Sequence, residues 1–221
     1  VWNWINLNIT IGGGFQGLPF SMPKINGKQL VESMKSFNGS IPWRSLVASM
    51  VLLDSHDTAR MRTVVLGDKG LHLTAMTLLL TYPGVPSIFA GDEIGLEGSS
   101  GEDSRRTINW EDQSSWDIAF LSEVKKLVAI RKKHDAFING GLRWVLVEDD
   151  CLAFLRESKK ETVLVFISRG KVKTSIDLAK HGYAVKESLY GISAAGSMIS
   201  IESDKPTQGV WVLESSQKLS G

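Results

Sequence analysis

The 221 residues are 43% hydrophobic, and 25 Lys and Arg against 24 Asp and Glu leave a formal net charge of +1. A chain of this length and composition can bury one good core or two small ones. Nucleic-acid binding and binding to an acidic membrane surface both need a concentrated positive field, so the charge balance argues against both. A neutral or weakly charged ligand fits this composition better.

The chain opens with an apolar pattern, Val1 to Leu7, that predicts a strand already under way. Val1 is not a start methionine, so we expect further residues upstream, although processing of a longer precursor would look the same. A Gly-rich loop is predicted from Gly12 to Gly17. It lacks the Lys-Ser or Lys-Thr pair of a phosphate-binding loop.

The next hundred residues alternate between helix and strand patterns. Helices are predicted at about 28–37, 69–81 and 116–133, and strands at 50–53 and 85–90. Both strand patterns are nearly continuous apolar runs that end in polar residues, which is typical of parallel strands buried on both faces. The order of strand and helix predicts parallel βα units.

From Leu142 onward the pattern changes to short apolar runs separated by turn residues, which predicts an antiparallel sandwich or barrel. The runs are 142–147, 151–156, 162–168, 175–178, 185–190, 198–201 and 210–213. Asp149-Asp150 and Lys159-Lys160 are predicted hairpin turns, and the one cysteine, Cys151, is predicted to be a small buried hydrophobe. The change of pattern near 139–141 predicts two domains, 1–138 and 139–221.

Reactive groups of a parallel barrel lie at the C-terminal ends of its strands, where polar loops converge. The sequence Ser-His-Asp-Thr-Ala-Arg at 55–60 follows such a strand. A histidine and a neighbouring carboxylate can hydrogen-bond the hydroxyls of a sugar, and the carboxylate can stabilise an oxocarbenium-like charge. A His-Asp pair is weak support by itself, because Asp and Thr also cap helices in solvated loops.

Three motifs that follow one another in the chain make a resemblance to a known family specific. Residues 52–60, Leu-Leu-Asp-Ser-His-Asp-Thr-Ala-Arg, resemble the fourth signature region of the α-amylase family of glycoside hydrolases, at the end of the seventh barrel strand. Residues 82–95 resemble the family's eighth-strand region, and residues 102–110 resemble the loop that follows it. The resemblance implies the C-terminal part of a (β/α)8 barrel, about strands six to eight, followed by an antiparallel β-sandwich domain.

The resemblance implies roles for individual residues. Asp57 matches the third catalytic carboxylate, which holds the hydroxyls of the sugar at the cleavage point, and His56 matches a histidine that hydrogen-bonds the same sugar. Arg60 is expected to bind substrate at the rim of the cleft.

Asp103 and Arg105 are further candidates for the rim. An alternative is structural: Arg105 or Arg106 pairs with Asp92, Glu93 or Asp103 and pins the loop. Glu93, Tyr82 and Trp110 are expected to have structural or packing roles first.

The sequence departs from the family's pattern in one respect that limits its predicted activity. Retaining hydrolysis needs a nucleophilic carboxylate and a proton-donating acid about 5–5.5 Å apart. The family's motifs for both residues do not occur in this sequence, and we expect them upstream of Val1. The resemblance implies that the parent protein acts on α-1,4-linked glucans, with α-1,6-linked glucans as a further candidate, such as starch, maltooligosaccharides or cyclodextrins, by hydrolysis or transglycosylation. The 221 residues alone are predicted to be inactive, with an open barrel edge available for self-association.

Two other functions stay open on the sequence. One is a carbohydrate-binding module that uses aromatic rings of the β-rich part: Trp144, Tyr183, Tyr190 and Trp211. The other is a relative without catalysis that serves as a scaffold or transporter subunit. No metal ligand is predicted; the wider family often binds calcium, but no such site is assignable to these residues. The sequence leaves a cytoplasmic and a secreted location equally open.

Overall fold

The computed structural model describes residues 1–7 and 23–216, so the Gly-rich loop predicted at 12–17 lies outside the described residues. The helices are α1 (Trp2–Ile5), α2 (Gly27–Gly39), α3 (Trp43–Ala48), α4 (Met61–Val64), α5 (Lys69–Thr81), α6 (Ile118–Lys133) and α7 (Asp135–Asn139). The strands are β1 (Met50–Leu52), β2 (Val85–Ser87), β3 (Gly141–Val147), β4 (Cys151–Glu157), β5 (Thr162–Ser168), β6 (Val172–Asp177), β7 (Tyr183–Gly191), β8 (Met198–Ser203) and β9 (Thr207–Ser215). Short 3-10 turns are η1 (Asp92–Ile94), η2 (Asp103–Arg105), η3 (Gln113–Ser115) and η4 (Leu178–His181).

The opening residues form a single helical turn, α1, so the predicted strand at Val1–Leu7 is wrong. A short apolar run has too few residues to distinguish the hydrophobic period of a helix from that of a strand. Contacts distant in sequence decide the conformation: the Trp2 indole donates to Leu53 O at 2.7 Å, and the Trp4 indole donates to Asp149 O at 2.9 Å. Both rings are buried.

The three longer predicted helices are confirmed, and their ends follow from their caps. The side chain of Asn26 accepts from Gln29 N in a capping box at the start of α2. Asp68 and Asp117 cap α5 and α6 by accepting from Leu71 N and Phe120 N, without a capping box. Tyr82-Pro83-Gly84 follows α5, and Gly84 has a φ of 123°, which favours glycine at this turn.

The two predicted parallel strands pair with each other, with Met50 opposite Val85 and Leu52 opposite Ser87. The expected burial on both faces is wrong for both strands: Met50 and Leu52 of β1 are 65% and 42% exposed, and Val85 of β2 is 54% exposed. Within the described residues β2 is the one strand that pairs with β1, so the other edge of β1 and much of its apolar surface stay open.

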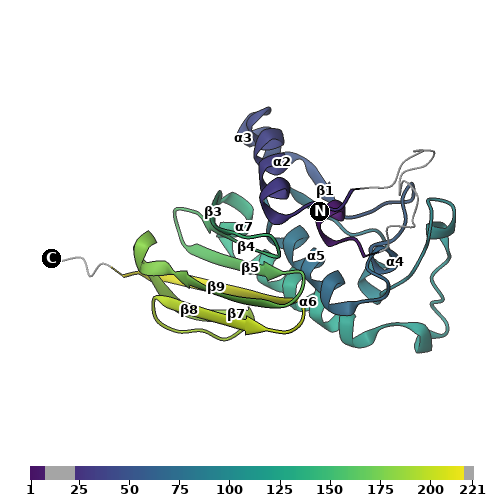
Figure 1. Cartoon of the computed structure of the whole chain (residues 1–221). Coiled ribbons are helices and arrows are strands. Elements are labelled where there is room, and N and C mark those ends of the chain that lie inside the picture. The colour runs from purple at the N-terminus through teal and green to yellow at the C-terminus, as the bar shows by residue number, and fades with distance from the viewer. Residues whose placement is uncertain (8–22, 217–221) are drawn as a thin grey trace.

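The antiparallel part is confirmed as two sheets. Strands β3-β4-β5-β9-β7 form one sheet in that order, and β6 and β8 form a smaller pair, on the left in Figure 1. The predicted hairpin turns at Asp149-Asp150 and Lys159-Lys160 lie between β3 and β4 and between β4 and β5.

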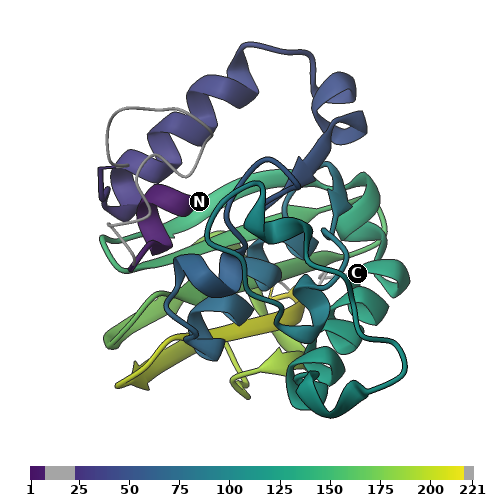
Figure 2. The same cartoon turned by 90° about the vertical axis from the view of Figure 1, so that its right-hand side faces the viewer.

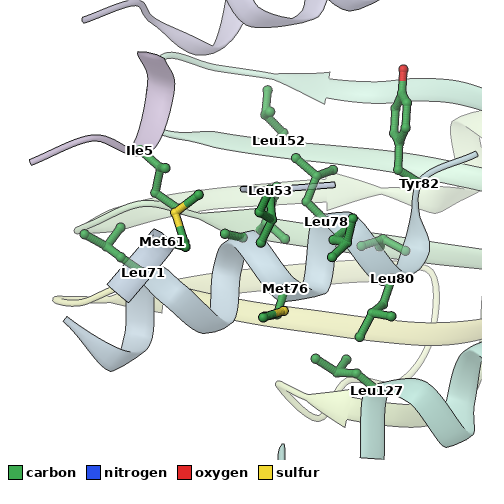
Figure 3. Close-up of a cluster of buried hydrophobic side chains, with 14 of the residues drawn as sticks. Ile5, Leu53, Met61, Leu71, Met76, Leu78, Leu80, Tyr82, Leu127 and Leu152 are labelled. Atoms are coloured by element: carbon green, nitrogen blue, oxygen red, sulfur yellow. The ribbon is translucent and has the colours of Figure 1, made fainter. Parts of the chain in front are cut away.

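The five-stranded sheet is the middle layer, and its strands β4 and β5 are buried on both faces. Alternate residues of β5 point in opposite directions: Val163 and Val165 join the core shared with the helices, and Leu164 and Phe166 join the core shared with β6 and β8. Helix α5 packs on the first face. Figure 3 shows Leu78 of α5 beside Leu152 of the sheet, and Leu127 of α6 on the other side of the helix.

The predicted domain division near 139–141 coincides with the end of α7 at Asn139 and the start of β3 at Gly141. The larger core nevertheless includes residues from both sides of that point, such as Met76 of α5 and Val210 of β9. Helices α2 and α3 lie at the opposite side of the molecule from the small β6–β8 pair (Figure 2). None of the described helices has the length and apolar character needed to cross a membrane.

A buried arginine joins the sheet to the helices. Arg156 of β4 is fully buried and donates to Thr81 O at 2.6 Å, at the end of α5. It also donates to Gly140 O at 2.9 Å and Gly141 O at 3.1 Å, after α7. Its guanidinium therefore satisfies carbonyls at two helix ends that the helices themselves leave without donors.

We expect Arg156→Met to lower the free energy of unfolding by about 3 kcal/mol, because several buried carbonyls lose their donor at once. Lys160→Met is the control, since Lys160 is exposed and pairs only with Asp135, at 3.5 Å. Urea denaturation of both variants measures the difference. A loss below about 1 kcal/mol for Arg156→Met would contradict the role given to the guanidinium.

A second buried cluster centres on His72 of α5. Its Nδ1 accepts from Arg62 Nε at 3.2 Å, and its ring stacks on Phe120 with centroids 4.4 Å apart. Burial first, and then the charge of Arg62, lower the pKa of His72 from 6.5 to about 3, against the opposing charge of Asp117. The ring is therefore neutral in the fold at neutral pH.

The unfolded chain takes up a proton on His72 before the folded chain does, so stability is full above pH 6.5 and falls as the pH drops toward 3. Between pH 7 and pH 4.5 we expect the wild type to lose about 2 to 3 kcal/mol more than His72→Gln. Urea denaturation of the wild type and of His72→Gln at several pH values measures the free energy of unfolding of each. Parallel curves for the two proteins would show that His72 does not cause this loss.

Candidate active site

The candidate site lies where the parallel strands β1 and β2 end. Parallel neighbours bring their carboxyl ends to the same edge of a sheet, so the turn after β1 meets the loop after β2. The turn after β1 carries His56 and Asp57 at its apex. Ser55 N donates to Thr58 Oγ1 at 3.0 Å and Asp57 N donates to Ser55 Oγ at 3.2 Å, which closes the turn locally.

The two predicted sugar-contacting residues both project into solvent. The side chains of His56 and Asp57 are 65% and 59% exposed, and His56 Nε2 lies 3.4 Å from Asp57 Oδ1. This is the arrangement a polar ligand needs, because donors and acceptors of adjacent residues are free to turn toward it.

Arg105, from the loop after β2, joins this pair. Its Nη2 lies 3.4 Å from Asp57 Oδ1, and its Nε donates to His56 O at 3.1 Å. Arg106 points elsewhere and forms an ion pair with Asp103 at 2.7 Å, as the structural alternative predicted for that pair. The pKa of Asp103 is lowered to about 2, first by the hydrogen bond that the Ser99 backbone N–H donates to it and then by the hydrogen bond from Arg106.

Arg60 is placed differently from His56 and Asp57. It is 1% exposed, and its Nη1 donates to Asp92 Oδ1 at 2.8 Å. Its other two nitrogens donate to Ser104 O and Ala90 O, both at 3.0 Å, and its guanidinium lies over the Phe89 ring. The partner of Asp92 is thus Arg60, not Arg105 or Arg106 as the structural alternative had it.

Two carboxyl groups of this site are buried: Asp54 had no role assigned from the sequence, and Asp92 was expected only as an alternative partner of Arg105 or Arg106. Asp54 lies below the turn and Asp92 begins η1, and both are almost fully buried. Burial raises the pKa of Asp92, and the neighbouring Asp54 raises it further, against the lowering effect of Arg60. Their positions directly after the two predicted strands are the signal that could have found them.

Within residues 1–7 and 23–216, no group of three or more His, Cys, Asp or Glu side chains is placed to hold a metal ion. The aromatic rings proposed as sugar platforms lie in the cores: Trp211 and Tyr190 are buried, and Trp144 packs edge-on against Phe154. Tyr183 packs against the smaller core. These four rings therefore do not support the hypothesis of a flat, exposed sugar-binding platform on the β-rich part.

Comparison with known proteins agrees with the motifs. The family model of the α-amylase catalytic domain matches residues 15–104, which include His56, Asp57 and Asp92. A cyclomaltodextrinase from Bacillus sp is 34% identical over 122 residues, covering 54% of this chain and 22% of the relative. A maltogenic α-amylase from Bacillus acidopullulyticus is 32% identical over 157 residues, covering 69% of this chain and 26% of the relative.

Solved structures show the same fold. The debranching enzyme from Nostoc punctiforme superposes with a TM-score of 0.77 at 23% identity, over 95% of this chain and 46% of that one. The resemblance to the α-amylase family is thus confirmed, and the chain is related to a part of those enzymes. It spans about a quarter of the length of the two curated relatives.

Arg60 is buried and Arg105 is exposed, so substitutions of these two arginines should have different effects on stability. Arg105→Gln should change the free energy of unfolding by less than about 0.5 kcal/mol, because its pair with Asp57 is solvated on both sides. Arg60→Gln should cost about 3 kcal/mol or more, because it leaves a buried carboxyl without its partner. Urea denaturation compares them, and equal effects would refute this description of the site.

Proposed function

We propose that this chain is part of a retaining glycoside hydrolase that acts on α-1,4-linked glucans, with α-1,6 linkages a second candidate. The observation that carries the proposal is the exposed His56–Asp57 pair at the end of β1, in the motif that matches the family. Cyclomaltodextrinase and maltogenic α-amylase are the names of its curated relatives, which supports maltooligosaccharides, starch or cyclodextrins as substrates.

In this proposal Asp57 and His56 hold the hydroxyls of the sugar at the cleavage point. Hydrogen bonds of this kind strengthen as the ring distorts toward the oxocarbenium-like transition state, so they lower the barrier more than they improve substrate binding. Arg105 orients the Asp57 carboxylate. Arg60 contacts protein atoms on all three of its nitrogens, so we assign it to positioning the loops instead of contacting the sugar.

We also propose that β1 and β2 are the seventh and eighth strands of a (β/α)8 barrel, and that residues 139–221 are a C-terminal β-domain that packs on the helices through a shared core. The open apolar edge of β1 supports the barrel assignment. A pocket of about 340 Å³ lies beside it, lined by apolar side chains that include Met34, Met50 and Leu78. Such a surface fits further barrel strands, and without them it is a site for self-association.

Within the proposal, the nucleophile and the acid lie on other strands of the parent, so the 221 residues alone are inactive. Hydrolysis by these residues at an ordinary enzymatic rate would refute this part. A non-catalytic relative that binds or scaffolds glucans is the second candidate. The intact His56–Asp57 pair, in the motif that matches the family, favours the enzyme.

A chimera tests the proposal: this chain replaces the matching stretch of the Bacillus cyclomaltodextrinase, which supplies the remaining strands. We expect the chimera to hydrolyse maltooligosaccharides, and Asp57→Asn to lower kcat/KM by about 10²- to 10³-fold, the scale of losing one interaction made in the transition state.

Asp204→Asn is the control, because Asp204 is an exposed carboxylate in the β-domain that pairs only with Lys171. It should leave kcat/KM unchanged. A folded chimera without activity, or an Asp57→Asn variant as active as the control, would sink the proposal. Circular dichroism of each chimera shows whether it is folded.

A further inference from the structure

Three buried side chains lie directly beneath the His56–Asp57 turn: Asp54, Arg60 and Asp92, named here the buried trio. Each is at most 3% exposed. Arg60 Nη1 lies 2.8 Å from Asp92 Oδ1, and Asp54 is the neighbouring carboxyl that, after burial, raises the pKa of Asp92. With both carboxyls ionised, the trio would hold a net charge of −1 away from water, which is costly.

The hydrogen bonds of Asp54 point to a retained proton. Its Oδ2 accepts from Met61 N at 2.5 Å, but its buried Oδ1 has no donor among the described residues. A bond between two carboxyls forms only when one of them is protonated. A proton on Asp92 would supply the missing donor to Asp54 Oδ1, and it would also make the trio neutral. The raised pKa of Asp92 agrees with this arrangement.

The trio holds both ends of the turn that carries His56 and Asp57. Asp54 precedes the turn and binds Met61 N beyond it. Arg60 ends the turn; its backbone N–H donates to Gly98 O at 2.9 Å, and its side chain donates to Ser104 O. Ser104 is the neighbour of Arg105, so the same guanidinium also fixes the loop from which Arg105 reaches Asp57.

We propose that Asp54, Arg60 and Asp92 form a neutral positioning unit that retains one proton between its two carboxyls and sets the direction of the His56–Asp57 pair. The three residues are positioning residues, because their contacts are with protein atoms. The purpose of the unit rests on the proposed function, whereas its proton and its neutrality do not.

Isosteric amides test the charge count. Asp54→Asn and Asp92→Asn each leave one carboxylate to balance Arg60 and place an N–H where the shared proton was, so each should lower Tm by less than about 3 °C. The double variant leaves Arg60 buried without a carboxylate and should lower Tm by about 10 °C, far more than the sum of the two. Asp204→Asn, at an exposed ion pair, is the control.

Each outcome is decisive. A double variant that equals the sum of the single variants would mean that charge balance does not hold the trio together. Single variants that raise Tm by several degrees would mean that both carboxylates are ionised in the fold, because each amide would then remove a buried net charge of −1. Either result overturns the proposal whether or not the chain belongs to an active enzyme.

A second measurement tests positioning. In the ¹⁵N-labelled chain, at a temperature where all variants are folded, the amide signals of residues 56–58 should stay in place in the single variants and shift in the double variant. In an active chimera, the double variant should lower kcat by more than the two single variants together. Unmoved amide signals in the double variant would refute the positioning role, and an inactive chimera would count against the proposed function alone.

Discussion

The parallel pairing of β1 with β2 is the constraint on which the candidate site depends. Antiparallel strands would place the residues after β1 and after β2 at opposite edges of the sheet. In the parallel register, with Leu52 opposite Ser87, Asp54 and Asp92 meet in the interior and Arg105 comes within reach of Asp57. A site assembled from two loops thus requires only three paired residues in each strand.

Much of the fold could be predicted because its signals are local. The helix at 69–81 has an Asp cap before it and a Pro-Gly stop after it, and the antiparallel strands are separated by their own turn residues. Residues 1–7 and β1 were harder. The conformation of α1 depends on indole hydrogen bonds to residues far along the chain, and the exposure of Met50 depends on which strands surround it. Neither property is encoded in a short sequence window.

The candidate site was predicted in its position and only partly in its contacts. The motif placed His56 and Asp57 at the end of a strand, and the structure shows both exposed there. It did not show which carboxylate pairs with Arg60, because Asp92 is 32 residues away in the chain and the two meet only through the fold. The same limit applies to Asp54, whose burial depends on residues that cover it from several elements.

The shared core between the helices and the five-stranded sheet has a consequence for how such proteins exchange parts in evolution. A β-domain that packed as an independent body could be lost, duplicated or swapped between relatives by a cut near residue 140. Here such a cut would strip the sheet from α5 and remove the Arg156 donors from the ends of two helices. The sheet and the helix beneath it are therefore inherited as one folding unit, even though the secondary structure changes from helix to strand between them.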